Sequence, residues 1–515
     1  MKILLAYSSG TTSTSADTTF TDLVPIGLCS LHALLRSNGH DAQLANLSRM
    51  PSHQVASLLR ELKPDLLGLS LWTHNRQATL ALARLARQLL PDCLIAAGGG
   101  HATHRAEQVL NTCPAIDLIV VGEGEAPLLE LVQRLTDGRP LEQIAGLAVR
   151  SGEAVRRTGP SRPVPDLDQL PYPSAYLHEA HGIDPDLQSQ FISTSRGCPS
   201  ACRFCSSPAF WGTTVRTRTP ASVLTECRSL RERFGTMYLS LRDDTFTADR
   251  ERTIELCRLM IAERTQQFWN CQTRVETVDD EMLSWMKRAG CECVQLGVES
   301  GSPRILKELG KRITPEQVIR AADAVHRVGL SLSIYLIAAV PGETTADRAA
   351  TERLVARMRP DDLQIAPLAY YPGTALYNSA VRHGNAAADL FEQNQEAALT
   401  LHPEGERLAA ALLQRLDRLR HRPSLHELQS THRRTGYCAV GALQIGDYYS
   451  SIGDWQNALS AYSEITHREP DHPWGWQLLA ELHEELGNRR KSLDCYRRLL
   501  ELVPQHRQAR CMLTQ

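Results

Sequence analysis

The sequence lacks a long apolar run, a strong net charge and the pattern of a signal peptide. Each absence excludes a class of protein. Its longest apolar stretch, residues 330–340, is shorter than the roughly 20 residues that a bilayer requires, and it contains two serines. The formal net charge of -2 provides no overall field for nucleic acid or an acidic membrane surface. Residues 1–6 continue into Ser and Thr residues without a cleavage-site pattern, which predicts a first strand rather than a signal peptide. We therefore expect a soluble, cytoplasmic protein that spans no membrane and binds no nucleic acid.

The 14 cysteines form no regular framework, which favours buried thiols in a reducing compartment over disulfides. One compact group departs from this scatter: Cys198, Cys202 and Cys205 form a C-x3-C-x2-C loop after a short apolar run. The other close pair is Cys291 and Cys293, which would share one face of a strand. This pair could either pack in the core or bind an auxiliary metal cluster, and the sequence leaves both interpretations open.

The spacing of the three-cysteine loop suits an iron–sulfur cluster. Three thiolates can hold three irons of a [4Fe-4S] cluster, and the fourth iron is then open to a substrate or cofactor. The alternative is that the three cysteines are simply small buried apolar residues. The apolar run 191–194 predicts a buried strand, so the loop would lie at the carboxyl end of that strand.

Strands and helices alternate along the first 140 residues. This rhythm predicts a doubly wound parallel sheet with a ligand at the carboxyl ends of its strands. A hairpin near residues 147–157 and a proline-rich stretch follow, and we assign residues 141–190 to a linker. The predicted strands of the first part are 2–7, 65–71, 94–97 and 117–121, and the predicted helices include 27–37 and 77–90.

The alternation resumes at residue 191 and gives six strand–helix units up to about residue 385. Polar residues follow each strand, which is where a barrel of parallel strands carries its chemistry. After 191–194, the predicted strands are 237–241, 268–273, 294–298, 330–340 and 363–368, with helices such as 251–263 and 315–328 between them.

The last 80 residues repeat with a period of 34. The matched positions are Gly453/Gly487, Ala458/Ser492, Leu459/Leu493, Tyr462/Tyr496 and Pro470/Pro504. This period is typical of tetratricopeptide (TPR) helix pairs, which present concave surfaces to peptides or proteins. Because two copies are fewer than such arrays need, we expect residues from about 404 to 436, most of them in the helical connector 386–435, to supply packing partners. A structural cap on the barrel is an equally open interpretation.

The C-x3-C-x2-C loop, with Phe204 before its last cysteine, resembles the signature of the radical S-adenosylmethionine (SAM) enzymes. In that family the open iron holds SAM, and one electron cleaves SAM reductively to methionine and a 5′-deoxyadenosyl radical. The resemblance implies a SAM site at the strand ends. Its members would be Phe204, Asp243 and Asp244 (for the SAM amino group), Arg274, Glu299, Ser300, and Ile337 (for the adenine). The chain departs from the family pattern at Tyr335 and Ala339, where the family often has glycine.

The first domain resembles the cobalamin-binding domains. Their Asp-x-His-x-x-Gly segment, Ser-containing strand and Gly-Gly turn correspond in order to residues 22–27, Ser70 and Gly98-Gly99. Val24 stands at the position of the cobalt-ligating histidine, so a bound cobalamin would lack a protein imidazole there. The implied cobalamin-binding residues are Ser70, Gly98, Gly99, Gly100 and Glu123. A domain that keeps the fold but has lost the ligand is the alternative.

The predicted fold class is α/β in three parts. They are a Rossmann-like cobalamin-binding domain (1–140), a radical SAM partial (β/α)6 barrel (191–385) and α-helical TPR-like repeats (436–515). The expected cofactors are a [4Fe-4S] cluster held by Cys198, Cys202 and Cys205, SAM, and cobalamin.

We expect a cobalamin-dependent methyltransferase that acts on an unactivated carbon. The alternatives are a radical cyclisation, oxidation or rearrangement without methyl transfer, and a non-catalytic adaptor that binds partners through its repeats. Expected partners are a small-molecule or peptide substrate, an external electron donor and, through the repeats, a protein. The sequence identifies no catalytic acid or base and no specific substrate.

Overall fold

The computed structural model describes residues 1–9, 23–152, 154–392 and 404–514. The chain forms two compact units, each assembled from several segments. The first unit contains Met1–Gln188, Arg196–Thr217 and Leu368–Pro403, and the second contains Ser189–Ser195, Arg218–Pro367 and Glu404–Gln515. The cysteine loop therefore packs with the first sheet, although the sequence suggested grouping it with the strands that follow it.

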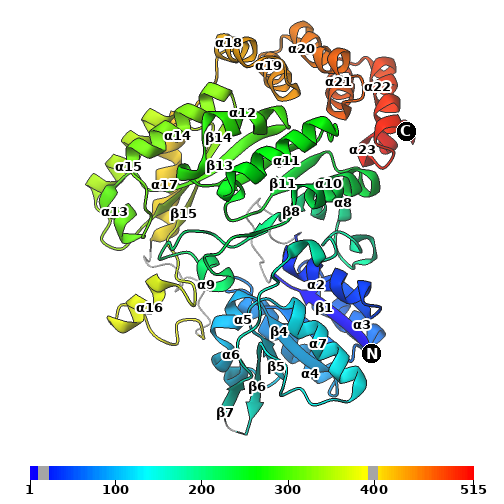
Figure 1. Ribbon diagram of the computed structural model, residues 1–515, viewed down its shortest axis with the longest axis vertical. Coiled ribbons are helices and arrows are strands. Elements are labelled where there is room, and N and C mark those ends of the chain that lie inside the picture. The colour runs from blue at the N-terminus through cyan, green and yellow to red at the C-terminus, as the bar shows by residue number, and fades with distance from the viewer. Residues whose placement is uncertain (10–22, 153, 393–403, 515) are drawn as a thin grey trace. The chain divides into compact units, whose positions relative to one another are not determined.

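The first unit is built on a seven-stranded sheet. Its elements are β1 (Lys2–Tyr7), α2 (Ile26–Ser37), β2 (Asp41–Asn46), α3 (Ser52–Leu62), β3 (Leu66–Ser70), α4 (Arg76–Leu89), β4 (Leu94–Gly98), α5 (Gly100–His104), α6 (Ala106–Thr112), β5 (Leu118–Val120), α7 (Glu125–Asp137), β6 (Leu147–Ser151), β7 (Ala154–Arg157), α8 (Pro185–Gln188), β9 (Ser195–Arg196), α9 (Ser207–Trp211), β10 (Arg216–Thr217) and α16 (Ala375–Arg382) (Figure 1).

The sheet has the order β2-β1-β3-β4-β5-β6-β7, and its first five strands run parallel. This order is that of a doubly wound sheet, and α2 packs against α7 while α3 packs against α4. Strands β1 and β3 are buried on both faces, which explains their continuous apolar sequences. The direction of the chain reverses between β1 and β3, where such sheets bind their ligands.

Two parts of this sheet differ from the sequence-based expectation. Strand β2 was not predicted, because its sequence Asp-Ala-Gln-Leu-Ala-Asn is short and half polar, as suits an edge strand. The hairpin β6–β7 was predicted as a hairpin but placed in the linker. It pairs antiparallel with β5 and extends the sheet.

The second unit contains a six-stranded sheet and the C-terminal helices. Its elements are β8 (Phe191–Ile192), α10 (Pro220–Phe234), β11 (Tyr238–Leu241), α11 (Arg250–Ala262), β12 (Phe268–Thr273), α12 (Asp280–Arg288), β13 (Cys291–Glu299), α13 (Pro303–Glu308), α14 (Pro315–Val328), β14 (Ser331–Ala338), α15 (Thr345–Met358), β15 (Asp362–Pro367), α17 (Gly405–Leu416), η6 (Asp417–Leu419), α18 (Leu425–Thr435), α19 (Ala439–Ser451), α20 (Trp455–Arg468), α21 (Pro473–Glu485), α22 (Arg489–Leu502) and α23 (Arg507–Thr514).

The six strands run parallel in the order β15-β14-β13-β12-β11-β8, which is their order along the chain reversed. Figure 1 shows helices α11, α12 and α14 lying along these strands. Helix α14 begins and ends where its sequence predicts: Thr314 and Gln317 form a capping box, Pro315 occupies the first turn, and Gly329 ends the helix with φ of 80°.

The C-terminal helices stack in antiparallel pairs beside the amino-terminal ends of strands β11 and β12. The equivalent tyrosines of the 34-residue repeat, Tyr462 in α20 and Tyr496 in α22, are both buried and each hydrogen-bonds an acidic residue of the preceding helix. Trp474 of α21 stacks on Phe268 with ring centroids 5.1 Å apart, and its indole N–H donates to the carbonyl of Met237 at 2.9 Å. These contacts support the interpretation of the repeats as a cap on the sheet.

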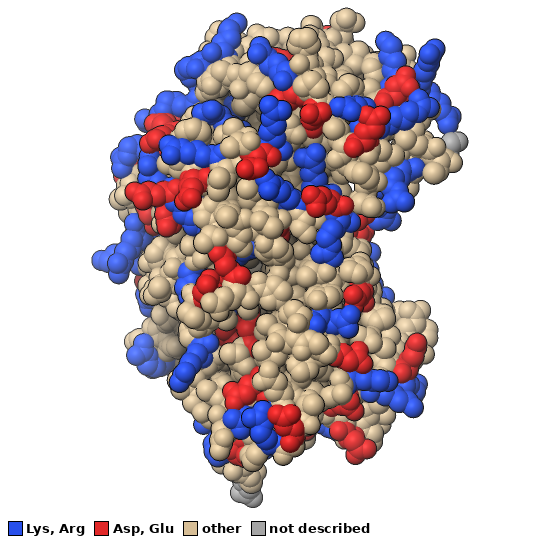
Figure 2. Space-filling model, turned by 45° about the vertical axis from the view of Figure 1, so that its right-hand side comes forward, with Lys and Arg blue, Asp and Glu red and all other residues tan. Residues whose placement is uncertain are grey.

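Lys and Arg side chains lie among Asp and Glu side chains over the face drawn in Figure 2, with no extended area of one sign on that face. Among the described residues, none of the helices combines the length and the apolarity needed to cross a bilayer.

Candidate cofactor sites

The cysteine loop is held at its base by the short strands β9 and β10. Gly197 between β9 and Cys198 has φ of 98°, and a Cβ there would overlap the carbonyl oxygen of Thr214. Cys198 is buried, whereas Cys202 and Cys205 are half-buried, and all three are thiols. Three soft sulfur donors within eight residues fit the three irons of a cluster that keeps one iron open.

Phe204 is half-buried in the same loop, next to Cys205. Arg203 anchors the loop, because its carbonyl oxygen accepts the backbone N–H of Leu376 at 2.8 Å. The segment that contains α16 therefore supports the cysteine loop from the side, although the sequence places the two about 170 residues apart. Whether Phe204 contacts SAM stays a prediction.

A buried ion network joins the base of the cysteine loop to the loop after β5. Glu123 accepts from Arg196 at 3.0 Å and from Arg216 through two contacts, of which the Nη1 contact is 3.1 Å. Arg196 also donates to Glu125 at 2.5 Å, and the backbone N–H of Val164 donates to Glu123 at 3.1 Å. The side chains of Glu123 and Glu125 are 4% and 6% exposed, so these pairs are desolvated. Such pairs are strongly destabilising when one partner is removed.

We predict that Glu123→Ala lowers the free energy of unfolding by about 3–5 kcal/mol, because it removes the carboxylate that pairs with Arg216 and one of the two carboxylates that pair with Arg196. Glu130→Ala is the matched control, since Glu130 pairs with Arg134 at 2.7 Å with its own side chain 42% exposed. That pair should contribute less than about 1 kcal/mol. Urea unfolding followed by tryptophan fluorescence measures both. Equal losses in the two variants would contradict the role given to the network.

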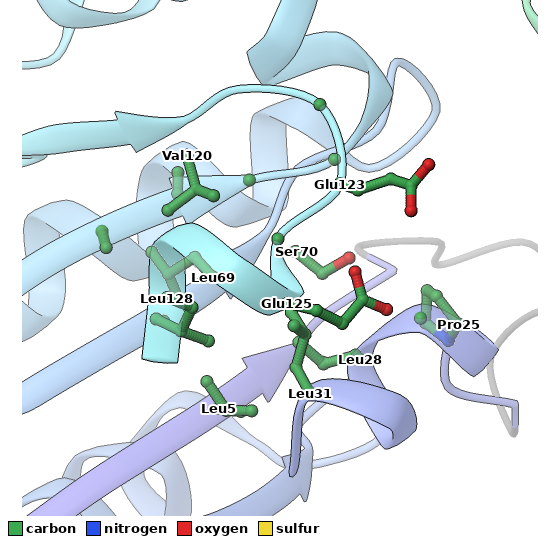
Figure 3. A pocket seen from close by; sticks show the side chains of 18 of the residues that line it. Leu5, Pro25, Leu28, Leu31, Leu69, Ser70, Val120, Glu123, Glu125 and Leu128 are labelled. Carbon is green, nitrogen blue, oxygen red and sulfur yellow. The ribbon is translucent and has the colours of Figure 1, made fainter. Parts of the chain in front are cut away.

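An apolar cavity of about 210 Å³ lies at the point where the direction of the chain reverses in the first sheet. In Figure 3 leucine side chains from β1, α2, β3 and α7 point into this space. Phe210 and Trp211 of α9 complete the lining. The branched aliphatic side chains labelled in that view are Leu5, Leu28, Leu31, Leu69, Val120 and Leu128.

The cavity fits an apolar group of a large ligand that lies over a glycine turn. Gly99 has φ of 108°, and a Cβ there would come within 2.9 Å of the carbonyl oxygen of Leu71. A side chain on Gly100 would meet the ring of Trp72 at 2.9 Å. Both its positive φ and its contact with Leu71 therefore favour glycine at position 99, and a side chain at position 100 would displace Trp72.

The cavity brings together most of the residues predicted to bind cobalamin. Ser70, Gly98, Gly99 and Glu123 line it, whereas Gly100 begins α5 and faces Trp72. The carboxylate of Glu123 is already paired with two arginines, so its contribution is to hold the loop rather than to donate a free group.

The segment that resembles the cobalt-ligating part of cobalamin-binding domains is only partly described by the structure. Val24, at the position of the family's cobalt-ligating histidine, is buried and exchanges two backbone hydrogen bonds with the side chain of Gln188. Asp22 lies outside the described residues. The sequence analysis also missed the leucines of the wall, because helical apolar spacing does not distinguish a cavity wall from a core.

In the second unit, the predicted SAM residues fall into buried and accessible groups. Asp243 is fully buried, and its carboxylate accepts the backbone N–H groups of Thr194 at 2.6 Å and Ser195 at 2.9 Å. It thus holds the chain in the segment that leads into the cysteine loop. Asp244 is exposed beside it.

The remaining predicted SAM residues are mostly tied to neighbours. Glu299, with φ of 67°, accepts from the ammonium of Lys311 at 3.0 Å, and both side chains are buried. Arg274 donates to Glu276 at 2.6 Å. The buried hydroxyl of Ser300 accepts the backbone N–H of Ser302 at 3.1 Å. Ile337 is half-buried on the same face of β14 as Tyr335. Their contacts with SAM stay predictions.

That face of the six-stranded sheet carries polar side chains that the sequence analysis overlooked. Gln272 of β12 donates to the hydroxyl of Tyr335 at 3.1 Å, and this hydroxyl donates to Gln295 of β13 at 3.0 Å. All three are half-buried, whereas their strand neighbours on the opposite face are buried. The alternation of polar and apolar residues in these strands was the available signal.

The pair Cys291 and Cys293 differs from the cysteine loop. Burial raises the pKa of both thiols above their ordinary range, and the Cys291 thiol is fully buried and lies 3.5 Å from the carbonyl oxygen of Cys293. A raised thiol pKa disfavours the thiolate that an iron would need. Of the two alternatives for this pair, the structure favours core packing.

Comparison with protein families identifies both expected domains, and comparison with curated proteins identifies relatives that cover most of the chain. The B12 binding domain matches residues 14–132, and the Radical SAM superfamily matches residues 192–355. The uncharacterised methyltransferase PH0819 of Pyrococcus horikoshii is 31% identical over 364 residues, which cover 69% of this chain and 78% of that protein. The anaerobic magnesium-protoporphyrin IX monomethyl ester cyclase of Cereibacter sphaeroides is 29% identical over 63% of this chain, and the match spans 55% of the cyclase.

Two solved structures share the fold. The radical SAM methyltransferase TsrM from Kitasatospora setae, with cobalamin and a [4Fe-4S] cluster bound, matches 74% of this chain and 75% of its own with a TM-score of 0.63 and 18% identity. The cobalamin-dependent radical SAM enzyme OxsB matches 98% of this chain and 79% of its own with a TM-score of 0.64 and 15% identity.

Proposed function

Because the chain belongs to the family of radical SAM enzymes that carry a B12-binding domain, we propose that it is a cobalamin-dependent methyltransferase acting on an unactivated carbon. One observation carries the proposal. The segment that supplies the cluster cysteines continues within five residues into α9, whose Phe210 and Trp211 form part of the wall of the apolar cavity. The cluster ligands and the cobalamin cavity are thus parts of one compact unit.

The chain's own residues bind and orient the cofactors in this proposal. When bound, the cluster supplies an electron to SAM, and cobalamin supplies a transferable methyl group. Cys198, Cys202 and Cys205 hold the cluster, and the leucine-lined cavity holds an apolar part of cobalamin and excludes water from it. Arg196 and Arg216, paired with Glu123, fix the base of the cysteine loop relative to the cavity.

The domain boundaries are part of the proposal. We assign residues 1–140 to cobalamin, 141–190 to a linker that contributes two strands to the first sheet, and 191–385 to the radical SAM core as a partial (β/α)6 barrel. A helical connector, 386–435, and TPR-like repeats, 436–515, complete the chain. The thiol state of all 14 cysteines favours a reducing, cytoplasmic compartment. The repeats would bind a protein partner only through surfaces that do not pack on the sheet.

The two neighbouring aspartates provide a prediction about SAM. Asp244→Ala should weaken SAM binding about 10-fold or more, because a hydrogen bond to a charged group contributes about 1.5–3 kcal/mol. Asp243→Ala should instead destabilise the fold, since it removes the acceptor of two buried N–H groups. Equilibrium dialysis of labelled SAM against cluster-loaded protein, with a thermal melt of each variant, separates the two effects. If a folded Asp244→Ala variant binds SAM with unchanged affinity, Asp244 does not contact the SAM amino group.

A radical cyclisation is the second candidate function. The 29% identity to the Cereibacter cyclase favours it, since that protein's name describes ring closure. The polar residues Gln272, Gln295 and Tyr335 would orient either kind of substrate by hydrogen bonds, because they present amide and phenol groups but no charge.

The test is an anaerobic assay on cluster-loaded, cobalamin-loaded protein with SAM and a reductant. Methyl transfer predicts both 5′-deoxyadenosine and S-adenosylhomocysteine, since one SAM is cleaved and a second donates its methyl group. Deoxyadenosine without S-adenosylhomocysteine would favour the cyclase-like function, and the absence of both products would contradict a radical enzyme.

A further inference from the structure

Two histidines and an aspartate meet in the second unit, in a region that the proposed reaction does not use. His326 lies in the last turn of α14, Asp361 directly precedes β15, and His421 follows η6. One ligand atom from each lies within 4.8 Å of the others. His421 Nδ1 is 3.1 Å from Asp361 Oδ1, and His326 Nε2 is 3.6 Å from Asp361 Oδ2.

Backbone contacts hold the Asp361 carboxylate and the chain segment that carries His421. The backbone N–H of Leu332 donates to Asp361 Oδ2 at 2.7 Å, and the backbone N–H of His421 donates to the carbonyl of Pro360 at 2.7 Å. Arg420 donates to the carbonyl of Asp361 at 2.8 Å. Because these two segments are already fixed, part of the ordering that a ligand would impose is complete.

His326 Nε2 is buried, and its contact with Asp361 Oδ2, at 3.6 Å, is too long for a hydrogen bond. Buried polar atoms are nearly always satisfied, and a bound ion would satisfy this one.

We propose that His326, Asp361 and His421 bind one divalent transition-metal ion of the Zn²⁺ type. Nitrogen and carboxylate donors at about 2.0–2.2 Å from the ion are what zinc takes in proteins, which places tetrahedral ligands about 3.3 Å from each other. Each imidazole lies near this distance from one oxygen of the Asp361 carboxylate, at 3.1 Å and 3.6 Å, and the three ligand atoms all lie within 4.8 Å of one another.

The site is open on one side. The same three residues line a cavity of about 1060 Å³, together with His426 and Tyr448. Three protein ligands leave at least one coordination position for water or a solute from that cavity. The ion would also join α14, the start of β15 and the segment before α18, which are far apart in the sequence.

The test is zinc binding by the full chain with its cluster and cobalamin loaded, so that the cluster cysteines are occupied. After dialysis against a chelator, zinc is added, and bound zinc is measured by elemental analysis and by competition with a chromophoric chelator. Wild-type protein should bind one zinc per chain more than His326→Ala, and Asp361→Asn should bind zinc at least 10-fold more weakly. His426→Ala is the matched control, because it removes an exposed histidine from the same cavity, and it should bind like wild type.

A thermal melt provides an independent readout that needs no activity. Zinc at 100 times its Kd should raise the Tm of the wild type by roughly 2–5 °C and leave that of His326→Ala unchanged. If Asp361→Asn does not fold, His326→Ala still decides the question, since its Nε2 makes no hydrogen bond that the fold would lose. Equal zinc in wild type and His326→Ala, or an equal loss in His426→Ala, would overturn the site.

Discussion

Cys202→Ala should abolish both the cluster and the reductive cleavage of SAM. Two thiolates cannot hold a [4Fe-4S] cluster with the geometry that leaves a single iron open, and without that iron SAM has neither its anchor nor its electron. Cys202 is half-buried in a surface loop, so the substitution should change the free energy of unfolding by less than about 1 kcal/mol. The expected result is a folded chain with no broad visible absorption after reconstitution and no 5′-deoxyadenosine.

The matched control is Cys511→Ala, which removes an exposed thiol from α23. This variant should take up iron and sulfide like the wild type and should cleave SAM at the same rate. Iron analysis, the visible and EPR spectra and the deoxyadenosine assay are run on both variants under anaerobic conditions. An active Cys202→Ala enzyme would overturn the assignment of the cysteine loop, and a loss in both variants would indicate general thiol damage.

The cysteine loop was predictable because its information is local. Three cysteines within eight residues predict a ligand set without any knowledge of the rest of the fold, and the glycine before them marks a turn. Most strands of the two sheets were predictable because their patterns are local: a continuous apolar run in β1 and β3, and an alternation of polar and apolar residues in β12 and β14. Strand β2 carries too little of that signal, because an edge strand tolerates polar residues on its exposed side.

The partners of charged residues could not be predicted, because they depend on contacts far apart in the sequence. Glu123 was assigned to cobalamin, yet its carboxylate pairs with Arg196 and Arg216, which are 73 and 93 residues away. Asp243 was assigned to SAM, and its hydrogen bonds go to residues nearly 50 positions earlier. Sequence showed in each case that a carboxylate follows a strand. It did not show whether the charge faces a ligand or holds the backbone.

Gly27→Phe should prevent cobalamin binding while leaving the fold intact. Gly27 lines the apolar cavity from the first turn of α2, and a Cβ at this position would meet no atom within 4 Å. Gly27 is exposed at the edge of the cavity, so a phenyl ring fits there without displacing the protein, and it takes volume that the cofactor would need. Phe is also the better helix former, so the free energy of unfolding should not fall. We expect cobalamin affinity to drop by roughly 100-fold or more, equivalent to about 3 kcal/mol of lost apolar burial.

The control for added bulk is Leu34→Phe, two turns along the same helix and outside the cavity wall. Both variants are loaded with cobalamin, passed through a desalting column and measured by visible absorption, with thermal melts alongside. Retention by Leu34→Phe and loss by Gly27→Phe would locate the cofactor at the reversal point between β1 and β3, where a doubly wound sheet binds its ligand. Since the cluster ligands are outside this cavity wall, Gly27→Phe should still assemble the cluster and form deoxyadenosine but no S-adenosylhomocysteine. Cobalamin retained by a folded Gly27→Phe variant would mean that the cavity is part of the scaffold, and methyl transfer would then lose its structural basis in this chain.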